Sequence, residues 1–152
     1  MTILKAEAGD LREILSLQYL AYQSEARLHN DPNIPPLRQT LADVQREFAE
    51  GLFLKAVDTE GAIVGSVRAY SKNGTLYIGK LIVRPDRQGQ GIGTQLLLEI
   101  ERAWPHDRCE LFTSRKSVRN IKLYQRHGYR EFYAKQAGPG LTMVYMEKRP
   151  GA

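Results

Sequence analysis

The stretch RPDRQGQGIG, residues 84–93, has the residue types and spacing best suited to holding a ligand. It places Gly89, Gly91 and Gly93 within five positions, between a β-rich run and an amphipathic helical pattern. Glycines let backbone N–H groups converge on an anion, and the first turn of a helix leaves N–H groups unpaired. A plain surface turn is the alternative. The order of strand, glycine loop and helix favours a site for a phosphate group.

Hydrophobic periodicity around this stretch predicts the order βααβββαβαββ, an α/β fold with a mixed, largely antiparallel central sheet flanked by helices. The predicted helices share an apolar face that recurs every three or four residues, and they cover 10–28, 41–50, 92–104 and 117–128. The predicted strands are β-rich runs between turn residues, and they cover 2–5, 52–57, 62–70, 75–83, 109–113, 130–135 and 141–148. The prolines of NDPNIPP, residues 30–36, predict an extended loop.

The run TLYIGKLIV, residues 75–83, is apolar on both sides, and we therefore expect it at the centre of the sheet. Strict alternation predicts two faces, formed by Leu76, Ile78 and Ile82 and by Tyr77, Leu81 and Val83. Lys80 is out of place in such a strand. Its stem either passes the sheet to reach solvent, or its ammonium group meets a carboxylate on a ligand.

Composition and charge set the broad class of the chain. Its 152 residues are 42% apolar and 26% charged, so we expect 1–152 to form a single domain. No apolar run is long enough for a membrane span and no signal-peptide pattern is present, so no membrane partner is expected. Cys109 is the single cysteine, which favours a reducing, cytoplasmic location. The net charge of +5 favours an anionic partner.

The pattern Gln88-x-x-Gly91-x-Gly93, preceded by Val83-x-Pro85, resembles the loop of the GNAT family of N-acetyltransferases, which move an acetyl group from acetyl-CoA to an amine. The resemblance implies that the loop amides hold the CoA pyrophosphate, while the pantetheine arm lies along the preceding strand. The cofactor-binding residues that it implies in the strand and loop are Leu81, Ile82, Val83, Gln88, Gly89, Gln90, Gly91, Ile92, Gly93 and Thr94.

A second motif, RNIKLYQRHGY at residues 119–129, is similar to a later motif of the same family. Asn120 and Tyr124 are four residues apart and share a helix face. The resemblance implies that Asn120 hydrogen-bonds the pantetheine and that Tyr124 also binds the cofactor, beside the CoA sulfur. The residues alone leave open a second interpretation, in which Tyr124 and Gly128 serve packing in an amphipathic helix.

Direct acetyl transfer requires an unprotonated amine, a donor for the oxyanion and an acid for the leaving thiolate. A phenol with the ordinary pKa of about 10 is protonated at neutral pH, so Tyr124 suits the role of acid. A backbone N–H group between Leu81 and Val83 is the expected oxyanion donor.

The general base is less clearly defined by the sequence. Many family members carry a glutamate on the central strand, where this sequence has Gly79 and Lys80. Either the acceptor amine has a low pKa, or a catalytic base such as Glu25 works from the first helix. By resemblance, the segment 24–39 walls the acceptor pocket. Glu25 and Lys80 would then favour a small acceptor of mixed charge, such as an amino acid or a peptide terminus.

These features predict an enzyme that uses acetyl-CoA as acetyl donor and a small primary amine as acceptor. Two other classes remain open: a non-catalytic acyl-CoA-binding sensor domain and a basic nucleic-acid-binding domain. The basic residues are dispersed and no nucleic-acid-reading motif accompanies them, so no nucleic-acid partner is expected. No metal site is predicted, and a homodimer is left open.

Overall fold

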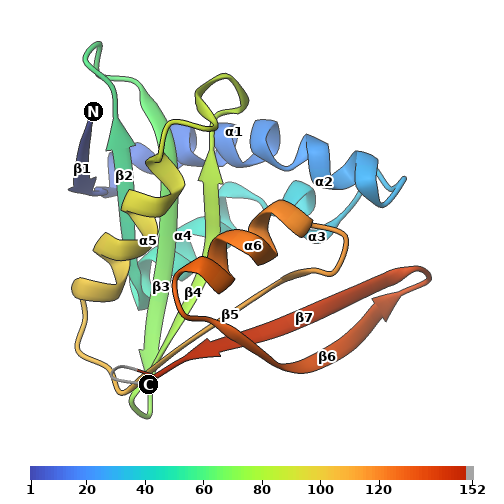
Figure 1. Ribbon diagram of the computed structural model, residues 1–152. Coiled ribbons are helices and arrows are strands. Elements are labelled where there is room, and N and C mark those ends of the chain that lie inside the picture. Colours follow the sequence, from blue (N-terminus) through green and yellow to red (C-terminus); the bar gives the residue numbers. More distant parts are fainter. Residues whose placement is uncertain (150–152) are drawn as a thin grey trace.

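The computed structural model describes residues 1–149 as a seven-stranded sheet with helices on both faces (Figure 1). The strands are β1 (Thr2–Lys5), β2 (Leu52–Val57), β3 (Ile63–Lys72), β4 (Thr75–Val83), β5 (Arg108–Ser114), β6 (Arg130–Gly138) and β7 (Leu141–Lys148). The helices are α1 (Leu11–Ala21), α2 (Gln23–Leu28), α3 (Pro35–Arg38), α4 (Leu41–Glu50), α5 (Ile92–Arg102) and α6 (Val118–Arg126), with short 3₁₀ turns η1 (Ala8–Asp10) and η2 (Pro85–Arg87). The strand order is β1-β2-β3-β4-β5-β7-β6, and only β4 and β5 are parallel.

The predicted fold class is confirmed, and several predicted boundaries are reproduced. β2, β4, β7 and α4 have the bounds that the sequence pattern predicts. The predicted helix 10–28 is two helices that meet at Tyr22, through which helical hydrogen bonds continue on both sides. The segment 30–36 is not extended throughout, because α3 begins at Pro35. Proline suits this first helical position, since its missing N–H group would have no helical partner there.

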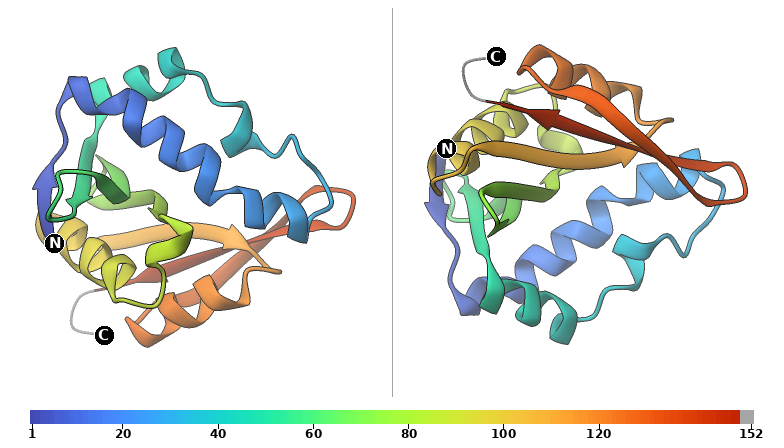
Figure 2. Two further views of the ribbon diagram at one scale, coloured as in Figure 1. Left: turned by 90° about the horizontal axis from the view of Figure 1, so that it is seen from above. Right: turned by 90° about the horizontal axis from the view of Figure 1, so that it is seen from below.

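Helices α1 to α4 cover one face of the sheet, and α5 and α6 cover the other (Figure 2). Helix α5 packs on strands β2 to β4 through its buried residues Leu96, Leu97 and Ile100. Under α1 and α4, the buried core includes Leu11, Ile14, Val44, Phe53 and Ile82. Each such side chain stabilises the fold by about 1.5–3 kcal/mol. No helix within residues 1–149 has the length and apolarity that a membrane crossing requires.

Strand β4 changes faces part-way along its length, which the predicted alternation missed. Arg68 on β3 pairs with Gly79, whereas Ser66 pairs with Ile82, so one residue of β3 opposes two of β4. This β-bulge adds a residue, and every side chain beyond it moves to the opposite face. Leu76 and Ile78 therefore share the α5 face with Leu81 and Val83, while Ile82 packs under α1.

The parallel pairing of β4 and β5 is short, and this creates room in the middle of the sheet. Only Thr75, Leu76 and Tyr77 pair with β5, through Arg108, Cys109 and Glu110. Beyond Tyr77 the two strands diverge, as Figure 1 shows. Because the N–H of Arg84 donates to Val64 of β3 at 2.8 Å, alternation turns the N–H groups of Leu81 and Val83 toward the divergence.

Candidate functional site

A cleft of about 660 Å³ opens where β4 and β5 diverge, between the glycine loop (residues 84–93), α2 and α6. Most of the residues singled out from the sequence line it: Glu25, Leu81, Ile82, Val83, Gln88, Gly89, Gly91, Ile92, Gly93, Thr94 and Asn120. Gln90 and Tyr124 do not line it. Gln90 is exposed on the loop, and Tyr124 is buried beneath α6. The structure thus brings two sequence motifs, about 30 residues apart, to one hollow.

The glycine loop has the backbone geometry of an anion site. Gly89 and Gly91 have φ angles of 80° and 82°, in the left-handed region that side chains disfavour. Gly91 is the N-cap of α5, no side chain caps this end, and no acidic residue lies in the first turn. The N–H groups at the positive end of α5 are therefore available to a ligand in the cleft.

A second helix N-terminus faces the same cleft, which sequence analysis did not foresee. Ser117 is the N-cap of α6, but its hydroxyl donates to Oε1 of Glu25 at 2.5 Å and does not cap the helix. The first turn of α6 contains no acidic residue, and Asn120 within it lines the cleft. Two uncapped helix ends thus place positive potential at one site. The absence of acidic residues from the first turn of α5 and of α6 is the feature of the sequence that could have indicated this pair of helix ends.

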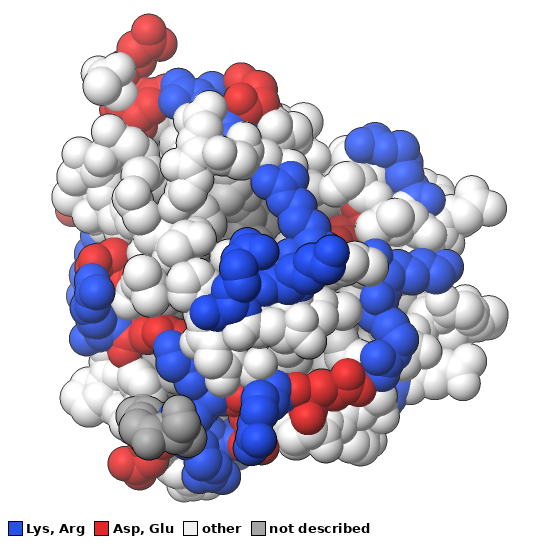
Figure 3. Space-filling model, in the orientation of Figure 1, with Lys and Arg blue, Asp and Glu red and all other residues white. Residues whose placement is uncertain are grey.

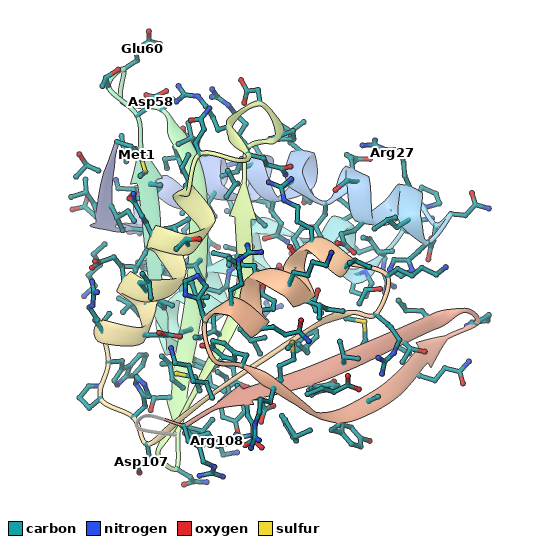
Figure 4. The ribbon with its side chains drawn as sticks, in the orientation of Figure 1. Met1, Arg27, Asp58, Glu60, Asp107 and Arg108 are labelled. Atoms are coloured by element: carbon teal, nitrogen blue, oxygen red, sulfur yellow. The ribbon has the colours of Figure 1, made fainter. Side chains whose placement is uncertain are left out.

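Basic side chains add to this potential. Arg87, Lys116, Arg119 and Arg126 line the cleft, and Figure 3 shows Lys and Arg gathered around a hollow over α6. Arg119 donates to Oε1 of Gln88 at 2.7 Å, which ties α6 to the glycine loop. Arg87 pairs with Asp58 at 3.0 Å, at the β2–β3 turn near the loop (Figure 4). The cleft therefore carries a surplus of positive charge, which favours anionic ligands.

Tyr124 lies near the C-terminal end of α6, and its side chain is 6% exposed. Its ring packs against that of Tyr129, with 5.9 Å between the ring centroids. Among residues 1–149 its hydroxyl forms no hydrogen bond, so its proton is not committed to a protein acceptor. Burial raises the pKa of Tyr124 well above its usual range, and the neighbouring Tyr22 and Glu25 raise it further. The phenol therefore keeps its proton at neutral pH.

Glu25 is held in place by contacts on both carboxylate oxygens. One oxygen accepts from Ser117, and the other lies 3.8 Å from Nε2 of His29. The Glu25 side chain is 18% exposed, so it is not a free surface group. Both ring nitrogens of His29 are buried without a hydrogen-bond partner among the described residues. The structure thus places His29 next to Glu25.

The expectation that Glu25 and Lys80 face one pocket is wrong. Glu25 lines the cleft, whereas Lys80 lines a separate cavity on the α4 side of the sheet. The reason is local. Glu25 lies on α2 and reaches Ser117 at the start of α6, while the bulge in β4 directs Lys80 toward Arg68 and Glu47.

The chain also matches known proteins in sequence and in fold. The family model described as acetyltransferase (GNAT) domain matches residues 36–150. This chain belongs to the GNAT acetyltransferase family. Among curated proteins, UPF0157 protein YqkA of Bacillus subtilis is 29% identical over 146 residues, 95% of this chain. The match covers 41% of YqkA, so the chain spans about two fifths of that relative.

Two solved structures illustrate the shared fold. The ribosomal-protein-S18-alanine N-acetyltransferase of Escherichia coli matches with a TM-score of 0.80 and 18% identity, over 97% of this chain and 92% of that one. A GNAT superfamily phosphinothricin acetyltransferase of Sinorhizobium meliloti, solved in complex with AcCoA, matches with a TM-score of 0.76 and 20% identity. That match covers 97% of this chain and 87% of the other.

Proposed function

We propose that residues 1–152 form one catalytic domain that transfers the acetyl group of acetyl-CoA directly to a primary amine. The observation that carries this proposal is the cleft at the divergence of β4 and β5, where the glycine loop and two uncapped helix ends converge. A pyrophosphate and a 3′-phosphate suit these amides and the surrounding basic side chains. The diverging strands leave the N–H groups of Leu81 and Val83 for the pantetheine and the thioester.

In this mechanism the chain supplies positioning and two proton transfers. The N–H groups of Leu81 and Val83 are donors for the oxyanion as the amine nitrogen bonds to the thioester carbonyl carbon. The C–S bond then breaks, the sulfur leaves with the electron pair, and Tyr124 gives it a proton. Glu25, directly or through water, accepts the proton that the amine loses.

The experiment that tests this function has two parts. Calorimetric titration with acetyl-CoA measures binding, and free-thiol release with a panel of amines measures transfer. We expect binding in the micromolar range and thiol release that depends on an added amine. Binding without thiol release from any amine would support the non-catalytic acyl-CoA sensor, and an absence of binding would contradict both functions.

The basic lining of the cleft gives a further prediction. Replacing Arg126 with Gln is expected to weaken acetyl-CoA binding about three- to tenfold, because one cation of the phosphate environment is lost. The salt dependence of binding should become shallower in the same variant. Calorimetry at two salt concentrations measures both effects.

The matched control is Arg102→Gln, which removes the same charge at the far end of α5, outside the cleft. Its acetyl-CoA affinity should equal that of the parent. Equal affinity in the Arg126 variant would mean that this side chain is only part of a solvated surface.

A further inference from the structure

A second cavity, of about 330 Å³, lies on the α4 side of the sheet and is lined by α4 and by strands β2 to β5 and β7. Ile78, Gly79 and Lys80 line it, and Leu81, the next residue of β4, lines the cleft. The two hollows therefore adjoin β4 where its pairing with β5 has ended. A cavity of this size holds a molecule as large as an amino acid.

Two aromatic pairs line the second cavity. Tyr70 and Tyr77, partners across β3 and β4, stack at 4.9 Å and 17°. Phe112 and Tyr145, partners across β5 and β7, lie 5.2 Å apart. Tyr77 pairs with Glu110, two residues before Phe112, so all four rings lie on one face of the sheet. Tyr70 and Phe112 are each about half exposed, at 50% and 51%, which leaves aromatic surface for a flat group.

The charged lining of the second cavity consists of three acids and two bases: Glu47, Glu50, Glu110, Arg68 and Lys80. Arg68 is 5% exposed, and it pairs with Glu47 at 3.3 Å, but its Nε–H is buried without a partner among residues 1–149. Glu110 pairs with Arg108 at 2.9 Å. The Lys80 ammonium has no ion pair or hydrogen bond within the described part of the chain. Lys80 is thus a cationic donor in the cavity wall that no protein carboxylate contacts as an ion pair.

Lys80 also has a strained backbone. Its φ angle is +50°, in the left-handed region, where a non-glycine residue raises the energy by about 1–3 kcal/mol. Burial, followed by the neighbouring Arg68, lowers the pKa of its side chain. Glycine would remove the backbone strain, so the lysine side chain at this position requires another explanation.

We propose that the second cavity binds the acceptor and that the acceptor is a free aromatic α-amino acid. The ring lies against the two aromatic pairs, and the carboxylate is bound by Lys80. One carbon separates the carboxylate from the amine, so the amine lies at the divergence beside Leu81. This inference rests on the proposed acetyl transfer, because it identifies the acceptor of that reaction.

The test uses phenylalanine and phenethylamine, which differ only in the carboxylate, with the full chain and acetyl-CoA. Thiol release should show a preference of the parent for phenylalanine. Lys80→Met should lower kcat/KM for phenylalanine about 10- to 100-fold and change that for phenethylamine less than about threefold. The change in this substrate ratio from the parent to Lys80→Met is the deciding quantity, because the difference in amine pKa between the substrates is the same for both proteins and cancels. Lys80→Gly should give the same result with the backbone strain removed, which excludes misfolding as the cause.

The control is Lys72→Met, which removes the same charge from an exposed position at the end of β3 and should not change kcat/KM for either substrate.

Calorimetric titration of phenylalanine into the protein with CoA separates this inference from acetyl transfer. Lys80-dependent binding without thiol release would support the amino-acid site while contradicting the transfer. Thiol release from phenethylamine or a polyamine, with no effect of Lys80→Met on any substrate, would overturn the amino-acid site and leave the transfer intact.

Discussion

Replacing Tyr124 with Phe is expected to lower kcat for acetyl transfer by about 10²–10³, while the dissociation constant for acetyl-CoA stays within about twofold of the parent. The substitution removes one oxygen atom and keeps the ring that packs against Tyr129. Because burial raises the pKa of Tyr124, the phenol stays protonated through pH 10, and its loss should not alter the pH profile below that value. Steady-state kinetics and calorimetry on the same preparation measure both quantities.

Tyr22→Phe is the comparison variant, since Tyr22 is a neighbouring phenol that lines the cleft and whose pKa burial also raises. A similar loss in both variants would indicate that the hydroxyls act through packing or polarity. An unchanged kcat in Tyr124→Phe would assign protonation of the thiolate to water.

Replacing Gly91 with Val is expected to weaken acetyl-CoA binding about 10- to 100-fold. A β-branched residue at φ 82° is strained by about 1–3 kcal/mol, and relief of that strain moves the N–H groups at the start of α5. No atom lies within 4 Å of the Cβ position, so the effect comes from backbone conformation and not from a clash inside the protein. Calorimetric titration of acetyl-CoA measures the change.

Gly140→Val controls for the strain itself. Gly140 has a φ of 68° at the β6–β7 turn, and its Cβ position is also open. We expect a similar loss of thermal stability with unchanged acetyl-CoA affinity. If Gly91→Val binds acetyl-CoA as tightly as the parent, the loop does not hold the phosphates.

Sequence patterns predicted the elements and the main cleft because these depend on short-range rules. The bounds of α4 follow from an N-cap threonine with an acid three residues on, and from a glycine after the last turn. The glycine loop could be located because glycine is strongly favoured where φ is positive. Such signals lie within a few residues of the structure that they specify.

The features that sequence analysis missed depend on contacts between distant residues. The bulge at Lys80 and Leu81 is defined by the pairing of β4 with β3, so alternation within β4 alone assigned Ile82 to the wrong face. The bond between Ser117 and Glu25 joins positions 92 residues apart. The second cavity is formed by side chains from α4 and five strands, and no single segment indicates it.

The three residue pairs that join β4 to β5 have a thermodynamic consequence for ligand binding. Beyond these pairs, one divergence adjoins both the cleft and the second cavity, so occupants of the two hollows share one degree of freedom, the separation of the strands. If acetyl-CoA stabilises the strand separation that the acceptor also needs, bound acetyl-CoA raises the affinity for the acceptor. The acceptor then raises the affinity for acetyl-CoA by the same factor. Substitutions at Leu76 or Cys109, which belong to the pairs and line neither hollow, would therefore change this coupling free energy without changing any ligand contact.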